Sequence, residues 1–296
     1  MQKASEERKG EFFILAHMVG VGVTPVIIAL SYTTLVPLAS LAWGVLVAGV
    51  LFGFVVLFRG LWRGFTKPKL FQYILGVSFF NVFLFHVLFF VGLQFTTAGN
   101  ASIILLMEVF TSFVFFHLIR REFISREHVL GASLMVLGAG IVLLPNVSSL
   151  NIGDFLILGA TIAPPLGNYF QRKARNIASS STIMFLRYAV TAPFIFALAY
   201  FINAPLELTG STAVLFIIFN GIIVFGISKV LFVESIHRIS VTKAKSIDSL
   251  APLLTLGLAW LVLHEVPTVW QLVSLIPFVI GIFLMTGQLN FGARRT

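Results

Sequence analysis

Six polar or ionisable side chains interrupt apolar stretches of this sequence and have the chemistry to bind a polar solute. They are Lys229, His86, Glu108, Asn168, Tyr169 and Arg187. A cationic group attracts a carboxylate, a carboxylate attracts an amine, and an imidazole exchanges a proton near neutral pH. Ionisable groups are costly inside apolar helices, so their presence there indicates function. We expect these six residues to bind a substrate or to couple its binding to protons.

Lys229 is the strongest of these candidates. It lies nine residues before Arg238, roughly 13 Å along a helix, which is too far for its ammonium to reach the surface easily. For His86 and Glu108 the simpler alternative is a hydrogen bond inside the protein, to a neighbouring helix or to nearby groups. Because histidine titrates near neutral pH, any proton coupling is expected to depend more on His86 than on Lys229.

The remaining charges have local partners. Glu234 precedes Arg238 by four residues and Asp248 follows Lys245 by three, so each acid is expected to form a pair on its own helix. Arg187 lies about two turns inside its apolar stretch, where it has three alternatives. It could extend to the surface, contact the substrate, or form a structural or gating ion pair with Glu234 or Asp248. We favour the ion pair.

The elements that must position these side chains are long apolar stretches. Of the 296 residues, 58% are hydrophobic and only 10% are charged, and the mean hydropathy is +1.01, which excludes a water-soluble globule. Apolar stretches of about 20 residues cross a membrane as helices. We therefore predict an all-α integral membrane protein with ten transmembrane helices. They run over residues 12–30, 36–58, 70–95, 98–119, 128–144, 155–170, 181–201, 212–236, 241–263 and 267–287.

The chain repeats itself at an offset of 143 residues. Without a gap, this offset aligns GEFFIL at residues 10–15 with GDFLIL at 153–158, and it also aligns Glu122 with Glu265. It places Lys229 on His86. A repeat of this length indicates a duplicated fold. We predict two five-helix repeats, 10–145 and 153–288, with cytoplasmic tails at 1–9 and 289–296.

The distribution of basic residues predicts the orientation. Of the 20 lysine and arginine residues, all but Arg187 and Lys229 lie in the two tails and in alternate connecting segments. Because basic residues concentrate on the cytoplasmic side of a membrane, both termini are predicted to be cytoplasmic. Five helices per repeat is an odd number, so the two repeats are predicted to insert with opposite topology. Such inverted repeats are typical of secondary transporters.

Two of the predicted helices contain residues that break helices. The first contains VGVGVTP at residues 19–25 and the sixth contains ATIAPPLGNYF at 160–170. The offset places Pro165 on Gly22, so both halves are expected to bend at the same place, with Asn168 and Tyr169 just beyond the bend. Interrupted helices at equivalent positions indicate a binding site. A packing kink without a ligand is an equal alternative.

Several of these segments resemble one known family. TTAGNAS at residues 96–102, Glu108, Glu122 and LGASLMVLGAGIVLL at 130–144 resemble the hairpin of the drug/metabolite transporter superfamily, EamA type. The second copy, SLAPLLTLGLAWLVLHEVP, has the proline and glutamate usual in that pattern, Pro252 and Glu265. Val109 and Gly44 depart from it.

This resemblance implies a carrier with a central cavity, formed mainly by the first, third, fourth, sixth, eighth and ninth helices, and it favours export. Asn81, Asn100 and Asn220 are further polar residues that could face the cavity. We expect a secondary transporter of a small organic metabolite such as an amino acid or similar zwitterion, because Lys229 could bind a carboxylate and Glu108 an amine. The alternatives are a channel or uniporter without proton coupling, and a membrane-embedded enzyme.

The enzyme alternative has little support in the sequence, which contains no nucleophile and base pattern, no metal-ligand cluster and no phosphate-binding loop. We expect no catalytic residue, metal or cofactor. The expected partners are a small-molecule substrate, the lipid bilayer of an inner or plasma membrane, and protons. Although the pI is about 10.2, the positions of the basic residues argue against nucleic acid. Both a monomer and a homodimer are compatible with the sequence.

Overall fold

The computed structural model describes residues 2–61, 67–120, 126–143, 151–239, 244 and 247–286, with side chains from residue 6 onward and without those of 116–120. Within these ranges every regular element is helical and no strand occurs, so the predicted all-α class is confirmed. Glu122, Lys245, much of the predicted 120–128 turn and the carboxyl tail lie outside the described residues.

The first half contains α1 (Gln2–Ser31), α2 (Pro37–Phe58) and a composite third span. That span joins α3 (Pro68–Val77), the π-helical segment η2 (Ser78–Leu84) and α4 (Phe85–Leu93). The rest of the half consists of α5 (Ala98–Ile104), α6 (Met107–Arg120) and α7 (Arg126–Leu143). Proline begins both α2 and α3, where its missing N–H would have no intrahelical partner. The Thr97 hydroxyl caps α5 by accepting a hydrogen bond from the backbone N–H of Asn100.

The second half follows the same order. It contains α8 (Ile152–Ala160), α9 (Ala163–Arg175), α10 (Ser180–Phe201), α11 (Gly210–Phe219), η4 (Asn220–Ile227), α12 (Ser228–Arg238), α14 (Ala251–Leu258), η5 (Ala259–Leu263) and α15 (Val269–Met285). The 143-residue offset carries both ends of α2 onto the ends of α10 and carries the start of α7 onto the start of α15. It also carries the π-helical segment η2 onto η4. The sequence pattern gave no sign of these π-helical segments.

Seven of the described helices are long and apolar enough to cross a membrane. They are Glu6–Ser31, Pro37–Phe58, Pro68–Leu93, Ala98–Phe115, Arg126–Leu143, Ser180–Phe201 and Gly210–Arg238. Two shorter apolar helices, Ala251–Leu263 and Val269–Met285, lie within the ninth and tenth predicted spans. The sixth predicted span is divided, because α8 ends at Ala160 and α9 begins at Ala163.

The first predicted helix differs from expectation in two ways. It begins at Gln2 instead of Phe12, because charged residues at its start find partners: Lys9 pairs with Glu6 at 2.6 Å, and Arg238 pairs with Glu6 at 3.1 Å. It is also one continuous helix with Pro25 inside it. The predicted break in the first helix is therefore absent, whereas the second half is interrupted between α8 and α9. A bend of α1 at residue 22 stays a prediction.

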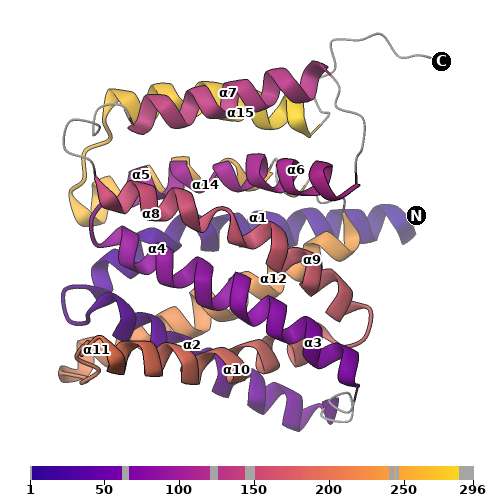
Figure 1. Ribbon diagram of the computed structural model, residues 1–296, viewed down its shortest axis with the longest axis vertical. Helices are drawn as coiled ribbons and strands as arrows, with labels where there is room; N and C mark the ends of the chain where they lie inside the picture. Colours follow the sequence, from indigo (N-terminus) through magenta and orange to yellow (C-terminus); the bar gives the residue numbers. More distant parts are fainter. Residues whose placement is uncertain are drawn as a thin grey trace.

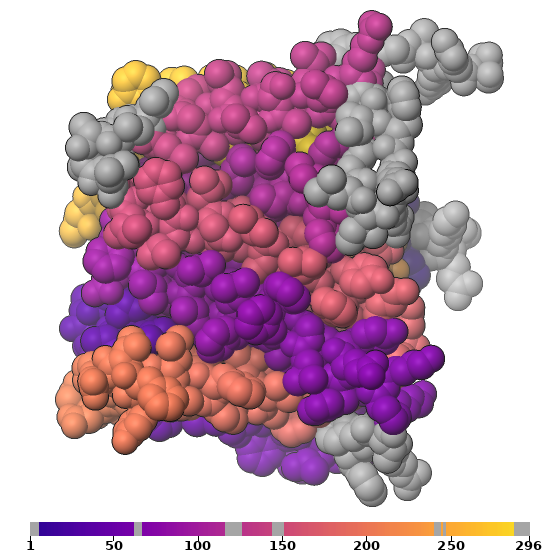
Figure 2. All heavy atoms as spheres, viewed as in Figure 1, coloured from indigo at the N-terminus to yellow at the C-terminus, as the bar shows by residue number. Residues whose placement is uncertain are grey.

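Each half packs its first span against the third span of the other half. In the first half, α1 contacts α12 of that third span and also α14 of the fourth; in the second half, α8 contacts α4 and α9 contacts α3. The corresponding helices α2 and α10 contact each other, as do α7 and α15 at one edge of the molecule (Figure 1). Figure 2 shows this packing between the halves on the surface. The purple α3–η2–α4 span of the first half lies between the red α8–α9 span and the orange α11 of the second half.

Glycine allows α8 to approach α4 very closely. A Cβ atom on Gly153 would lie 2.4 Å from the carbonyl oxygen of Gly92, and a Cβ on Gly92 would lie 3.0 Å from the carbonyl oxygen of Gly153. Backbone atoms cannot move aside as the tip of a flexible side chain can, so this contact requires glycine.

Candidate functional site

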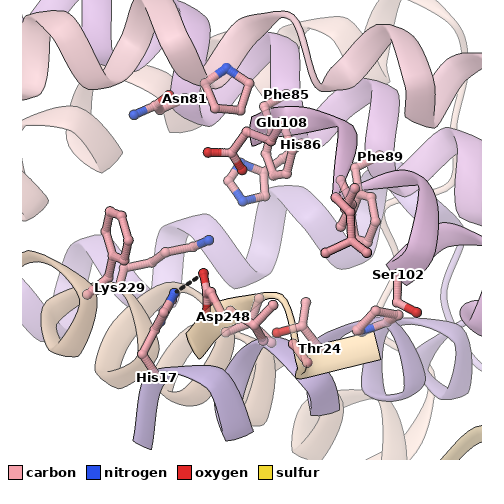
Figure 3. A pocket seen from close by; sticks show the side chains of 18 of the residues that line it. His17, Thr24, Asn81, Phe85, His86, Phe89, Ser102, Glu108, Lys229 and Asp248 are labelled. Carbon is pink, nitrogen blue, oxygen red and sulfur yellow. Dashed lines mark ion pairs between the residues drawn. The ribbon is translucent and has the colours of Figure 1, made fainter. Parts of the chain in front are cut away.

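A cavity of about 160 Å³ lies between the two halves (Figure 3). Its walls come from α1, from η2 and α4, from α5 and α6, from α9, from α12 and from residues 248–255, with Arg187 of α10 added. These correspond to the six spans that the resemblance implied, and to one residue of the seventh. The volume has room for several water molecules or a small solute.

The two deep basic side chains occupy equivalent places in this cavity. His86 lies two residues beyond the end of η2 and Lys229 two residues beyond the end of η4. In Figure 3 the Lys229 ammonium points into the space between His86 and Asp248. π-Helical turns inside α-helices are frequent at functional sites, because the extra residue changes which side chains face inward.

His86 is 4% exposed and is held in an aromatic setting. Its ring centroid lies 4.8 Å from that of Phe85 and 4.9 Å from that of Phe225. Its Nδ1 lies 3.2 Å from the carbonyl oxygen of Val82, which can only accept, so Nδ1 carries a hydrogen. Among the described residues, no carboxylate lies within ion-pair distance of His86.

Glu108 lines the cavity from the start of α6, directly after the interruption at residues 105–106 that separates α5 from α6. Thr111, one turn later, donates a 2.6 Å hydrogen bond to the carbonyl oxygen of Thr161. That oxygen belongs to the break between α8 and α9, so a side chain of the first half satisfies a backbone group that the second half leaves open.

Arg187 does not form the expected ion pair. Its Nη1 donates to Oε1 of Gln171 at 3.1 Å, its Nη2 donates to the Tyr188 hydroxyl, and its guanidinium lies over the Tyr188 ring at 4.5 Å. Tyr188 in turn donates to the carbonyl oxygen of Phe225. Within the described part of the chain, neither Glu234 nor Asp248 reaches Arg187. The arginine is 4% exposed and lines the cavity, so neutral acceptors hold a buried cation there.

The other predicted pairs have separate outcomes. Glu234 accepts from Arg238 at 2.6 Å, which confirms that pair. The expected partner of Asp248, Lys245, lies outside the described residues.

The polar residues beyond the α8–α9 break lie in different surroundings. Asn168 lines the cavity, and its Oδ1 accepts a 3.0 Å hydrogen bond from Nδ2 of Asn81, which lines it too. Tyr169 does not belong to the lining and is 37% exposed. Asn220 is also elsewhere, since its Nδ2 donates to Oγ of Ser40 at 3.0 Å.

Sequence reasoning missed His17, although it is an ionisable side chain inside a predicted membrane helix. It is 4% exposed and lines the cavity from α1. Its Nδ1 contacts the Ser228 carbonyl oxygen at 2.8 Å, and its Nε2 lies 3.6 Å from Oδ2 of Asp248 (Figure 3). The cost of burying an ionisable group, which we applied to Lys229, would have identified His17 as well.

A second buried polar cluster joins α5, α8 and α15 away from the cavity lining. Asp154 is 1% exposed and accepts hydrogen bonds from the Thr96 hydroxyl and from Nδ2 of Asn100, the latter at 3.5 Å. Oδ1 of Asn100 accepts from Nε2 of Gln271 at 2.7 Å. Nearby, Oε2 of Glu265 accepts from the backbone N–H of Ala98 at 3.0 Å. Burial raises the pKa of Glu265, against the lowering effect of its backbone hydrogen bonds.

The cavity therefore combines a carboxylate from the first half with an ammonium from the second, beside amide and imidazole groups. Glu108 suits a cationic group, and Lys229 and Arg187 suit an anionic one. Among the described residues, no three His, Asp or Glu side chains gather closely enough to hold a metal ion.

Comparison with known proteins gives a consistent result. The model of the EamA-like transporter family matches residues 8–144 and again residues 151–287. An uncharacterized transporter of Methanothermobacter thermautotrophicus is 28% identical over 213 residues, which cover 67% of this chain and 60% of that protein. A solved crystal structure aligns over its full length with 99% of this chain, with a TM-score of 0.64 and 16% sequence identity. At that identity the likeness describes the fold alone.

Proposed function

Because this chain belongs to the EamA-like transporter family, we propose that it is a secondary transporter that carries a small zwitterionic metabolite, such as an amino acid, by alternating access around the cavity. The family and the name of the relative agree on a transporter, and the several apolar helices agree with a multi-pass membrane protein. Substrate class, direction and mechanism are our proposal.

The observation that carries the proposal is the opposite charge placed in one enclosed space. Glu108 comes from the first half and Lys229 from the second, and both line the same cavity. A zwitterion has an ammonium and a carboxylate a few ångströms apart and can satisfy both side chains at once. In a low-dielectric setting such charge-assisted contacts are strong, and a ligand that supplies only one of the two charges gains less.

The architecture that we propose is ten membrane crossings in two inverted repeats, residues 10–145 and 153–288. The agreement of helix ends at the 143-residue offset supports the duplication. The reciprocal packing of α1 on α12 and of α8 on α4 supports a pseudo-two-fold relation between the halves. On this proposal α8 and α9 form one interrupted crossing, and so do residues 247–263.

We propose that the protein lies in the inner or plasma membrane with both termini in the cytoplasm. We also propose that it transports its substrate out of the cell. The start of α1 and the end of α15 lie at the same end of the molecule (Figure 1).

The chain contains no cysteine, so a single introduced cysteine can be labelled without background. In intact cells, a membrane-impermeant maleimide should label Asn203→Cys but spare Asn176→Cys. Labelling of Asn176→Cys alone would overturn the orientation.

The function is tested by thermal unfolding of detergent-purified protein in the presence of amino acids, nucleobases, polyamines and organic acids. A ligand at 100 times its Kd stabilises the folded state by about 2.7 kcal/mol. The best ligand is then used in radiolabelled counterflow with proteoliposomes, which distinguishes a carrier from a channel. We expect amino acids to stabilise the protein and to show counterflow. Stabilisation only by polyamines or only by organic acids would contradict the zwitterion.

The roles of the cavity residues are tested by Lys229→Met, Glu108→Gln and His86→Gln, with Tyr200→Phe as a control because Tyr200 is 75% exposed. We expect Lys229→Met and Glu108→Gln each to weaken binding at least about tenfold, since each leaves one ligand charge without its partner. The control should behave as wild type. Wild-type affinity in Lys229→Met would remove the lysine from the site.

A further inference from the structure

His17 is the one cavity residue of α1 that can exchange a proton, and both of its ring nitrogens face groups of the second half. Nδ1 lies 2.8 Å from the carbonyl oxygen of Ser228 and 3.0 Å from its Oγ. Nε2 lies 3.6 Å from Oδ2 of Asp248. The side chains of His17 and Asp248 are 5% and 12% exposed.

The first of these contacts determines the tautomer. A carbonyl oxygen can only accept a hydrogen bond, so Nδ1 must carry a hydrogen and donate it to Ser228. In a neutral imidazole the lone pair then lies on Nε2, facing the carboxylate of Asp248. A lone pair facing an ionised carboxylate is unfavourable. One additional proton converts the contact into an imidazolium and carboxylate ion pair, or into a carboxylic acid beside Nε2.

The other charges near His17 come from few of the elements that pack against α1. The helix α12 contributes Lys229 inside the cavity and, farther along, Glu234, His237 and the Arg238 that pairs with Glu234. The helix α4 contributes His86. The ranges of α5, α11, α14, η4 and η5 contain no titratable residue. Glu108 of α6 faces the same cavity. Among the described residues, Asp248 is therefore the carboxylate within ion-pair distance of His17.

This arrangement occurs once in the duplicated fold. At the 143-residue offset, His17 corresponds to Ala160, Ser228 to Phe85 and Asp248 to Leu105. The contact between α8 and α4 therefore has apolar residues where the contact between α1 and α12 has a titratable pair.

We propose that His17 and Asp248 together bind one proton, and that the protonated pair is a latch between α1 of the first half and the segment before α14 of the second. With the proton bound, the ion pair holds the two halves together at this side of the cavity. When the proton leaves to cavity water, the lone pair of Nε2 faces the carboxylate and the attraction is lost. The effect of the latch on transport rests on the proposed transport function. Proton binding by His17 and Asp248 does not depend on transport.

Proton binding is tested by NMR of the full-length protein in lipid nanodiscs, with ¹⁵N-labelled histidine, across pH 5 to 8. His17→Asn assigns the signal, because the asparagine Nδ2 replaces Nδ1 as donor to the Ser228 carbonyl and only Nε2 is lost. We expect His17 to carry hydrogen on Nδ1 throughout and to gain the second proton on acidification. Asp248→Asn should bind that proton at least about tenfold more weakly, because the neutral amide removes the attracting charge.

Two NMR results would overturn the proposal. One is a His17 signal with hydrogen on Nε2 alone, and the other is an Asp248→Asn variant that titrates as wild type. Loss of the fold in one variant leaves the other and the wild-type tautomer as independent readouts.

The latch is tested by counterflow of a radiolabelled mixture of the common amino acids in proteoliposomes at pH 5.5, 6.5 and 7.5. The wild-type rate should rise several-fold with pH, and Asp248→Asn should flatten that dependence. A pH-independent wild-type rate, together with the expected NMR titration, would overturn the latch and leave proton binding intact. Absence of any counterflow would count against the proposed substrate, while the NMR result would stand.

Discussion

The two contacts between the halves use equivalent helices but different chemistry. In the His17 interface, where α1 meets α12 and the segment before α14, a buried imidazole lies between Ser228 and Asp248. In the Gly153 interface, where α8 and α9 meet the α3–η2–α4 span, glycine backbones touch and Asn81 donates to Asn168. A duplicated backbone can thus carry a histidine–aspartate contact on one side and a close glycine contact on the other.

The two interfaces should also respond differently to separation. Attraction between charges declines slowly with distance, whereas close van der Waals packing is lost within about an ångström. The His17 interface can therefore loosen in steps set by protonation, while the Gly153 interface holds its geometry. The comparison predicts that release of the proton bound by His17 and Asp248 loosens the His17 interface and leaves the Gly153 interface unchanged.

The largest effect is expected from Gly153→Ala in the close-packed interface. The new Cβ would lie 2.4 Å from the Gly92 carbonyl oxygen, so the helices must separate, at a cost of about 1–3 kcal/mol or more. Gly159→Ala on the same helix meets nothing within 4 Å and should stabilise by about 0.5–1 kcal/mol. Thermal unfolding of both variants checks this, and similar unfolding temperatures would contradict the close contact.

A smaller effect, on rate instead of folding, is expected from Pro165→Ala. Proline has no N–H to bond the Thr161 carbonyl oxygen, which accepts instead from Thr111 at 2.6 Å. Alanine supplies that N–H, so the break between α8 and α9 can close and release Thr111. We expect counterflow to slow several-fold at unchanged expression. Pro193→Ala, at an exposed position inside α10, is the matched control. Equal loss of folded protein and of rate would instead indicate a packing role.

Ser228→Ala removes the hydroxyl contact to Nδ1 of His17 and keeps the carbonyl contact, so it should lower stability only modestly. The backbone carbonyl remains as acceptor at 2.8 Å, so losing the hydroxyl should cost about 0.5–1.5 kcal/mol and leave proton binding at His17 unchanged. Unfolding temperature and histidine NMR at two pH values measure both quantities. A tenfold loss of proton binding would show that the hydroxyl, and not the carbonyl, determines the tautomer.

The smallest effect is expected from Glu265→Gln, which removes a titratable carboxyl outside the membrane spans. Burial raises the pKa of Glu265, so its ionised form is penalised in the folded state and stability falls as pH rises through that pKa. Glutamine keeps an oxygen for the Ala98 N–H and cannot ionise. The variant should lose less stability than wild type between acid and neutral pH. An unchanged profile would exclude Glu265 as a source of pH dependence separate from His17.

Much of the helical layout could be predicted from the sequence. The predicted span 36–58 corresponds to α2 at Pro37–Phe58, and the span 181–201 to α10 at Ser180–Phe201, because apolar length and flanking charges determine where such helices end. The π-helical segments could not be predicted, since an extra residue per turn leaves the apolar composition unchanged. The continuity of α1 through Pro25 could not be predicted from composition either; in the structure Thr255 donates a 2.7 Å hydrogen bond to the Gly22 carbonyl oxygen of this helix.

The candidate site was predicted in part. The free-energy cost of burying an ionisable group identified Lys229, His86, Glu108 and Arg187 as candidates. All four line the cavity, and so does Asn168. Their roles stay predictions. The partner of Arg187 was predicted wrongly, because periodicity on one helix contains no information about Gln171 on another. Tyr169 was predicted together with Asn168 because both follow the expected bend, but adjacent residues on a helix point about 100° apart, and only Asn168 lines the cavity.

The single His17–Asp248 pair has an electrical consequence. With the proton bound, the imidazolium and the carboxylate have no net charge; once the proton has left, the pair carries one negative charge inside the low-dielectric layer. Displacing that charge fully across a membrane potential of 100 mV involves about 2.3 kcal/mol. Because the equivalent positions Ala160 and Leu105 carry no charge, no opposing displacement occurs there in the other repeat. The transition of the unloaded protein between its two orientations should therefore depend on voltage, with a polarity determined by the side on which the pair lies.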